Sequence, residues 1–364
     1  DLSIIDPTID GWIVAAHIHE DLQFAPVAKK SQLIRRLAFD VTGLPPSPEA
    51  VAAFEADERD DAYENLVDEF LQSEEFGVRW ARMWLDLARY ADSHGFQRDD
   101  LRNMWAYRDW VVDALNDDMP FDQFTITQIA GDLLPDANEA TRIATGFHRC
   151  APTNVEAGTD PEESRINQVF DRVNTTGAVW LGVTLECAQC HDHKYDPFSQ
   201  EEYYRFAAYF NSTEAEAERA NPKVPSSIKF IGPSMNLSHD PWAAERKSIS
   251  QSLRDAQKNV KQIKGDKTGK DVIQDESEGP TTCGGEMLVD QQEQQKDSDA
   301  RLKTKEKKVK QLQNKLSSIP QAKTLVMKDK AMPRETFVFN RGDFTDPSKQ
   351  VEAGTPLVLG GKTN

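Results

Sequence analysis

The stretch that organises this chain reads TLECAQCHDHKYDPF and spans residues 184–198. It contains Cys187, Cys190 and His191 in the spacing C-x-x-C-H, which is typical of covalent c-type haem attachment. Two thiols at this spacing can bond to the two vinyl groups on one edge of a porphyrin, and the adjacent histidine then lies under the iron as an axial ligand. The motif therefore predicts haem c as the cofactor.

Two other interpretations of the motif exist. A redox dithiol normally sits in a thioredoxin-like βαβ pattern, and none surrounds this one. A structural zinc ion could be bound by Cys187, Cys190 and either His191 or His193. Zinc sites usually draw on a second ligand pair, and the sequence has no further C-x-x-C and no H-x-x-x-H. Haem is the favoured interpretation, with zinc as the alternative.

Composition narrows the class of protein. The 364 residues carry a net charge of −18, which argues against a nucleic-acid partner because phosphates would be repelled. The sequence contains no run of about 18 apolar residues, so no transmembrane segment is predicted. The first residues do not read as a signal peptide. Covalent haem attachment at this motif normally takes place outside the cytoplasm, so we expect an exported protein, periplasmic, at the cell surface or extracellular.

The pattern of apolar residues predicts a mainly α fold: a multi-helix haem-binding domain, an appended antiparallel coiled-coil hairpin and a short β-containing tail. Proline, asparagine and glycine separate the helical stretches. A wide apolar stripe over 76–88 predicts a buried helix, and 336–339 reads as a strand. Helices are expected at 62–72, 105–116, 121–130, 140–147, 161–185 and 199–210, and one begins at Pro48 after the N-cap Ser47.

The hairpin is predicted from a heptad pattern in two segments. Apolar residues recur at steps of four and three in both, with Lys305 weakening one position of the second. The first seam is Ile249, Leu253, Ala256, Val260 and Ile263, and the second is Leu302, Val309, Leu312, Leu316 and Ile319. Between them 265–298 is polar and lacks periodicity, which predicts a long tip. The hairpin is a candidate docking surface for a protein partner.

These patterns divide the chain into four parts. Residues 1–213 are the predicted haem domain, 214–242 an extended linker, 243–319 the hairpin and 320–364 the start of a further region. Cys150 and Cys283 remain outside the motif, and a disulfide between them is one hypothesis for their state. The Arg341-Gly342-Asp343 sequence is expected to form an ordinary turn.

Residues Ile5 to Thr213 resemble the planctomycete DUF1549 proteins, also called the PSCyt2-type cytochrome domain. The matching runs are LAFDVTGLPP (37–46), YADSHG (90–95), DRVNTTG (171–177) and CAQCHDHKYDP (187–197). PRETFVFNRGD (333–343) is similar to the opening of the DUF1553 region that usually follows. The resemblance implies an exported haem c protein and brings little mechanism. Family members often have Asn where Cys150 stands, which weighs against an essential thiol there.

Several side chains are candidates for the rest of the site. His193 cannot easily reach the opposite face of a ring tethered at Cys190, so His193, Asp192 and Asp196 are predicted to surround and orient His191. The second axial ligand must come from a distant residue. His148 is the first candidate, because the loop after it leads into the helix that ends at the motif, and His94 is the runner-up. Met83 and Met104 follow.

Two functions remain open from the sequence. If two protein side chains ligate the iron, the chain is an electron carrier with a redox partner protein. If the distal face is open, it is a haem enzyme, and Arg149 with an acid such as Glu156, Asp160 or Asp99 could do acid–base work. Because no pairing of nucleophile and base is evident, electron transfer is favoured.

Overall fold

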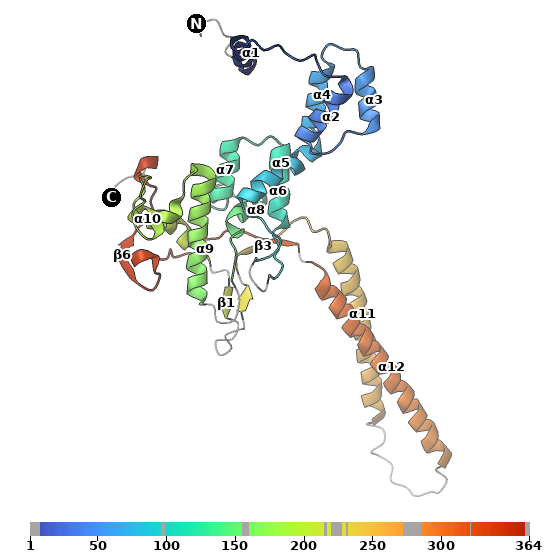
Figure 1. Cartoon of the computed structure of the whole chain (residues 1–364). Coiled ribbons are helices and arrows are strands. Elements are labelled where there is room, and N and C mark those ends of the chain that lie inside the picture. The colour runs from blue at the N-terminus through green and yellow to red at the C-terminus, as the bar shows by residue number, and fades with distance from the viewer. Residues whose placement is uncertain are drawn as a thin grey trace.

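The chain is mainly helical, with short antiparallel strand pairs, as the sequence predicts (Figure 1). The computed structural model describes residues 8–95, 99–154, 160–214, 217–219, 228–230, 232–271, 285–320 and 322–360. Within these ranges no helix is both long enough and apolar enough to cross a bilayer.

Three early helices form a small group that packs on itself: α2 (Lys30–Val41), α3 (Pro48–Ala56) and α4 (Ala62–Leu71). The helix before them, α1 (Ile9–His19), has no buried residue and lies apart from this group. Ile34, Leu37, Phe54 and Leu66 make a hydrophobic cluster shared by α2, α3 and α4. The predicted N-cap at Ser47 is present, with its hydroxyl accepting a hydrogen bond from the backbone N–H of Ala50 at 3.1 Å. Figure 1 shows this group set apart from the helices that follow.

The next helices surround a second, aromatic cluster. They are α5 (Glu74–Leu87), α6 (Trp105–Asn116), α7 (Phe121–Ala130), α8 (Glu139–Ala144) and the 3₁₀ helix η2 (Thr145–Arg149). Tyr107, Phe124 and Phe147 are buried in this cluster, and Trp84 packs against it.

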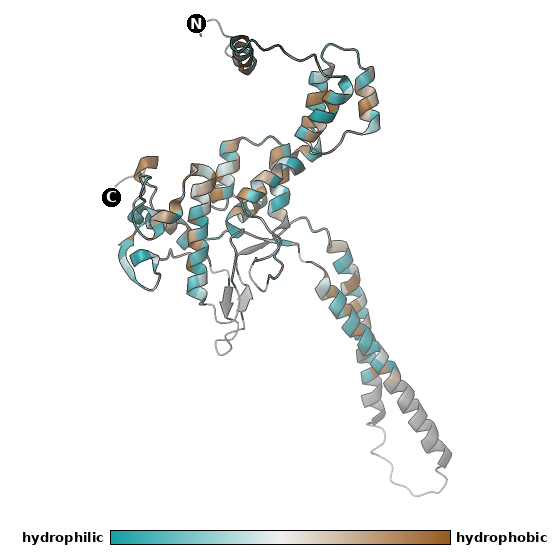
Figure 2. Cartoon of the chain, viewed as in Figure 1, coloured by the Kyte–Doolittle hydropathy of each residue, from teal (hydrophilic) through white to brown (hydrophobic). Residues whose placement is uncertain are grey.

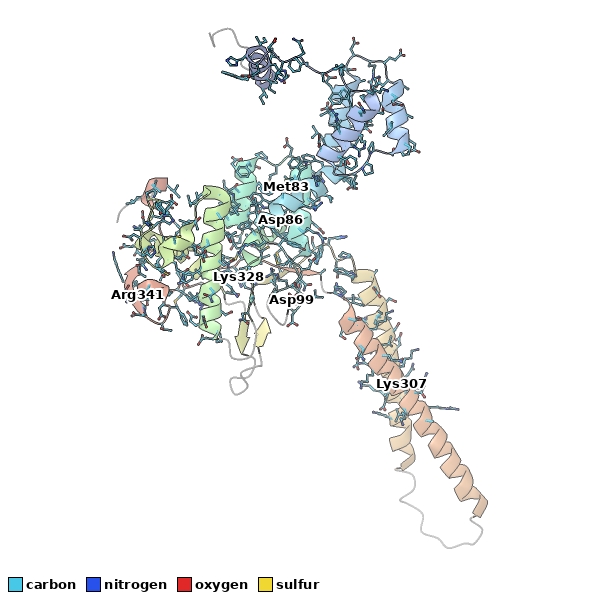
Figure 3. The ribbon with its side chains drawn as sticks, in the orientation of Figure 1. Met83, Asp86, Asp99, Lys307, Lys328 and Arg341 are labelled. Atoms are coloured by element: carbon cyan, nitrogen blue, oxygen red, sulfur yellow. The ribbon has the colours of Figure 1, made fainter. Side chains whose placement is uncertain are left out.

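The predicted burial of the apolar stripe on α5 is wrong. Trp80 is 40% exposed and Met83 is 52% exposed. The residues of α5 that are buried are small: Gly77 and Ala81. Gly77 lets α5 approach α6 so closely that its N–H donates to the Asn116 side-chain oxygen at 2.7 Å. The wide stripe therefore lies largely on the surface, and Figure 3 labels Met83 on α5.

The motif lies between two helices, α9 (Pro161–Thr176) and α10 (Gln200–Asn211), which pack against each other. Asp160 caps α9 by accepting hydrogen bonds from the N–H groups of Glu162 and Glu163. The helix predicted to reach Leu185 ends earlier. It continues as the π-helical turn η3 (Gly177–Leu181) and stops at Gly182, whose φ of +64° is left-handed. The 3₁₀ helix η4 (Leu185–Gln189) then carries Cys187.

Strands from the second half of the chain pack onto this helical body. They are β1 (Ala217–Arg219), β2 (Ile228–Phe230), β3 (Ser234–Asn236), β4 (Lys323–Leu325), β5 (Thr336–Phe339) and β6 (Pro347–Val351), pairing as β1–β2, β3–β4 and β5–β6. Short 3₁₀ turns occur at η6 (Asn340–Gly342) and η7 (Leu357–Leu359). Val338 and Val351 join the core cluster of α9 and α10. The tail thus shares a core with the helices before it, whereas the four-part division stays a prediction.

Where the coiled-coil hairpin is predicted, two long helices, α11 (Ala243–Asp271) and α12 (Gly285–Ser318), lie side by side (Figure 1), and the coiled coil itself stays a prediction. Ile249, Ala256 and Ile319 of the predicted seam are buried. The ion pair Lys264–Glu306, at 2.9 Å, joins the two helices. Both helices extend into the range 265–298 that was predicted as the tip, so the predicted tip is longer than the observed one. Polar residues such as Gln, Lys and Glu have good helix propensity without any seam. Cys283 lies outside the described residues, and its hypothetical disulfide with it.

Candidate functional site

The cysteines of the motif stand on a rigid support with their thiols at the surface. Cys187 belongs to η4 and Cys190 is the residue that ends it. Leu185 and Ala188 of this turn are buried in the cluster of α9 and α10, which anchors the backbone. Cys187 and Cys190 are both exposed and unbonded. Two thiols held at fixed spacing at the surface are the arrangement that thioether attachment to a flat ring requires.

The ring of His191 has a defined tautomer. Its Nδ1 atom lies 2.7 Å from the main-chain carbonyl oxygen of Asp192. A carbonyl oxygen only accepts, so Nδ1 carries the proton of this hydrogen bond. In the neutral ring Nε2 then keeps its lone pair, and the side chain is exposed. This is the state in which a histidine binds a metal through Nε2, with the Nδ1–H contact fixing the ring.

His193 is committed to the loop that follows the motif. Its Nδ1 accepts hydrogen bonds from the backbone N–H groups of Asp196 at 2.7 Å and Tyr195 at 3.2 Å. The other ring nitrogen, Nε2, faces the Asp196 carboxylate at 3.5 Å, and the side chain is only 7% exposed. His193 and Asp196 therefore hold the 193–198 loop, and this leaves His193 no free nitrogen for a metal. That the two residues also orient His191 stays a prediction.

Four hydrogen bonds link the motif, α10 and the tail. The Asp192 carboxylate accepts from the N–H of Gln200 at 2.8 Å, at the start of α10. The Tyr204 hydroxyl donates to the Gln189 carbonyl at 3.0 Å. The Gln200 side-chain amide donates to the carbonyls of Gln189 and of Phe339 in β5, both at 3.1 Å. Asp192 thus supports His191 through its carbonyl and α10 through its carboxylate.

The turn at Arg341 and Gly342 packs directly on the motif, which the sequence did not reveal. Both residues are left-handed, with φ of +55° and +78°. A Cβ added to Gly342 would lie 2.9 Å from Cys190 Sγ, closer than ordinary packing allows. Glycine is therefore required here for two reasons, the backbone conformation and the approach to the sulfur. Figure 3 labels Arg341 in this turn. The sequence predicted the turn itself and gave no signal of its neighbour.

His148, the first candidate for second axial ligand, lies in the protein core. Its side chain is fully buried, with ring centroids 4.8 Å from Phe210 and 5.2 Å from Phe147. Burial, with Arg172 and Arg89 nearby, lowers the pKa of His148 to about 3, so the ring is neutral. Phe210 lies near the C-terminal end of α10, whereas Tyr204 and Gln200 contact the motif. The helical rise separates Phe210 from Gln200 by about 15 Å.

The remaining ligand candidates lie on other elements of the fold. His94 is buried in the loop after α5, where its backbone N–H donates to the Asp100 carbonyl. Met104 is fully buried at the start of α6, and Met83 is exposed on α5. The structure therefore presents Cys187, Cys190 and His191 on one turn with its loop, whereas the contacts described for His148 and His94 are with residues of other elements.

The acid–base residues suggested for an enzyme have other roles. Arg149 is buried and donates to the carbonyls of Pro233 and Val326, both at 2.7 Å. Asp160 caps α9. Hydrogen bonds from the Ser93 hydroxyl and the Gly95 N–H lower the pKa of Asp99. Glu156 lies outside the described residues. None of the three described groups is placed as a proton donor or acceptor beside the motif.

Buried arginines form a network that sequence reasoning missed. Arg102 donates to the carbonyls of Arg149, Cys150 and Ala151, and Arg172 donates to the carbonyl of His148 at 3.0 Å. The free-energy cost of burying a guanidinium group is offset only when its N–H groups donate hydrogen bonds. The arginines fix residues 148–151 between the two core clusters. Burial raises the pKa of the Cys150 thiol to about 12, so this thiol is unreactive.

The donor set also bears on zinc. In the part of the chain that the structure describes, no group of three or more His, Cys, Asp or Glu side chains converges to hold a metal ion. The motif side chains would have to rearrange to form a tetrahedral site. Thioether attachment makes no such demand on the two thiols, because each bonds to a different carbon of the ring.

The fold and the motif define a mainly helical protein with an exposed C-x-x-C-H site. Residues 8–215 match the PSCyt2 family, described as "Protein of unknown function (DUF1549)", and the chain belongs to this family. Searches of curated proteins and of solved structures found no match.

Proposed function

We propose that the chain is an exported c-type haem protein that transfers electrons through a haem attached covalently at Cys187 and Cys190. The observation that carries the proposal is the hydrogen bond from His191 Nδ1–H to the Asp192 carbonyl. It holds the ring in the tautomer that offers Nε2 to iron, directly after the two thiols. When bound, the haem supplies one-electron chemistry at a potential set by its ligands and its exposure.

The residues present fit this group. Cys187 and Cys190 offer free, exposed thiols from a turn anchored by Leu185 and Ala188. The His193–Asp196 loop closes the motif on its C-terminal side. A site at the surface leaves the edge of the ring accessible, and a redox partner protein can then approach it. The segment 333–343, the expected start of a DUF1553-like region, would form part of the same structural unit as the motif, because Gly342 packs against Cys190.

A haem enzyme with an open distal face is the second candidate. The position of His148 favours it, since this ring lies between Phe147 and Phe210 and would have to leave the core to reach the iron. In that case an exogenous ligand or substrate occupies the second axial position.

The two candidates differ in how the reduced protein treats carbon monoxide. An electron carrier with two protein ligands gives a low-spin spectrum that carbon monoxide leaves unchanged, and it is reduced reversibly by one electron. An open distal face gives a high-spin spectrum that shifts on addition of the gas. Redox titration followed by this addition decides between them, and electron transfer is the expected result.

A further inference from the structure

A cavity of about 270 Å³ lies between α9, α10 and the tail segment 334–347. Figure 1 shows α9 and α10 next to the C-terminal strands. Two of the lining residues also take part in the hydrogen bonds that hold the motif: the Tyr204 hydroxyl donates to Gln189, and the Phe339 carbonyl accepts from Gln200. The proposed electron transfer makes no use of this cavity.

The floor of the cavity is apolar and aromatic. Phe170, Tyr204 and Phe339 contact one another edge to face, with ring centroids between 5.2 and 6.1 Å apart. Figure 2 shows hydrophobic residues recurring among hydrophilic ones along α9, and the buried Ile166 and Val169 of this helix line the cavity. Such a floor favours a flat apolar group, because the contact removes apolar surface from water.

Two arginines supply positive charge to the same cavity. Arg334 is anchored by its Nη1 group, which donates to the main-chain carbonyls of Asn211, at 3.0 Å, and of Thr213. Burial and the nearby charge of Arg165 lower the pKa of Arg334, and Glu162 offsets part of this effect. Two guanidinium groups this close repel each other, so an anion between them and the solvent is favoured.

One edge of the Arg334 guanidinium is available to a ligand. Among the described residues its Nε and Nη2 groups have no hydrogen-bond partner, and both remain accessible. These two N–H groups lie parallel, which is the geometry that binds both oxygens of a carboxylate. Glu162 is engaged by Arg165 at 2.6 and 2.9 Å, and Glu335 is exposed and forms no ion pair within the described ranges. Neither acid therefore occupies this edge.

We propose that the cavity binds a small carboxylic acid with an aromatic body, with the carboxylate on Arg334 and the ring on the aromatic floor. The volume lies just below the range of about 300–1,000 Å³ that is usual for drug-sized ligands, so one ring with a short chain is the matching size. An inorganic anion would leave the floor unused. A neutral aromatic molecule would leave the free edge of Arg334 unused.

Isothermal titration calorimetry of the full chain with phenylacetate tests the site. We expect one phenylacetate per chain with a Kd on the order of 0.1 mM. Phenylacetamide keeps the ring and removes the charge, and acetate keeps the charge and removes the ring. Each of these two molecules should bind at least about tenfold more weakly than phenylacetate, because each loses one of the two contacts.

Two variants examine the two halves of the site separately. Arg334→Gln removes the charge and should weaken phenylacetate binding at least about tenfold. Arg246→Gln is the matched control, because Arg246 Nη1 also donates to a carbonyl, that of Pro320, but does not line the cavity. This control should bind as the wild type does. Ala207→Leu places a larger side chain in the cavity, keeps both arginines and should abolish binding. Circular dichroism shows whether each variant is folded.

Several results would overturn the proposal. They are a wild type that does not bind phenylacetate, equal affinity for phenylacetamide, and unchanged binding in folded Arg334→Gln or Ala207→Leu. Loss of binding in the Arg246→Gln control would overturn it as well. If Arg334→Gln does not fold, because its two carbonyl contacts are lost, the comparison of phenylacetate with phenylacetamide on the wild type decides. The outcome is independent of haem attachment, so a negative result leaves the proposed electron transfer untouched.

Discussion

The imidazole Nδ1 of His191 lies 2.7 Å from the main-chain carbonyl oxygen of Asp192. One residue thus orients the proposed axial ligand through its carbonyl, while its carboxylate accepts a hydrogen bond from the N–H of Gln200 at the start of α10. The position of the imidazole is therefore coupled to a helix whose aromatic face is buried in the core.

Gly342→Ala tests the contact between the tail and the motif. The new Cβ would collide with Cys190 Sγ and would also force an alanine into a left-handed conformation. Gly360→Ala is the matched control, because Gly360 has a φ of +86° with nothing within 4 Å of its added Cβ. In urea titrations we expect Gly342→Ala to lower the free energy of unfolding by about 2 kcal/mol more than the control does. Equal losses would show that the turn does not press on Cys190.

The buried His148 should make stability depend on pH. Its folded pKa of about 3 lies below the unfolded value near 6.5, so below pH 6.5 the unfolded chain binds a proton that the native state does not. The contribution of this neutral ring to the free energy of unfolding is fully present above pH 6.5 and is lost progressively as the pH falls towards 3. Between pH 7 and pH 5 the free energy of unfolding of the wild type should fall by about 2 kcal/mol more than that of His148→Phe. Identical losses in urea titrations would contradict the burial of a neutral ring.

The haem spectrum should not depend on His148. The ring lies against Phe210, which the helical rise places about 9 Å from Tyr204 and about 15 Å from Gln200, the α10 residues that contact the motif, so His148→Phe is expected to leave the spectrum unchanged. Optical spectra of the oxidised and reduced proteins measure this. His94→Ala, at a second buried loop histidine, is the parallel variant. A change from low spin to high spin in His148→Phe alone would show that the core opens and that His148 is the second ligand.

The hairpin should be removable. β3 and β4 pair antiparallel, with Asn236 opposite Lys323, so the chain ends that flank the hairpin already meet. Replacing residues 240–320 with a short Gly-Ser linker should leave the unfolding temperature of the body within a few degrees of the wild type. Thermal unfolding followed by circular dichroism at one protein concentration measures it. Unfolding of the shortened protein would mean that the stem supports the body.

Local signals predicted the elements, and distant contacts escaped prediction. α6 and α7 have the predicted bounds because Pro120 and polar residues separate their apolar patterns. α10 begins at the capping box of Ser199 and Glu202, which is complete in four residues. The contact of Gly342 with Cys190 has no such signal, because it joins segments far apart in sequence. A periodic pattern also cannot tell which stripe finds a partner, and the exposed Trp80 and Met83 show the consequence.

In the candidate site, too, some features follow from the local sequence and others depend on contacts with distant residues. The C-x-x-C-H motif is visible in five residues, and the tautomer of His191 depends on the residue next to it. The position of His148 depends instead on Arg172 holding its carbonyl and on the aromatic rings of α10. Connectivity through the 151–160 loop suggested that His148 returns to the motif, but packing decides where the ring lies.

The mass of the intact protein tests the central claim most directly. The protein is produced with export and haem maturation, extracted with acid acetone to remove any unattached haem, and weighed beside Cys187→Ala/Cys190→Ala. We predict one haem increment on the wild type and none on the double variant. A wild-type mass without that increment, together with one zinc ion per chain, would contradict the assignment of haem to this motif.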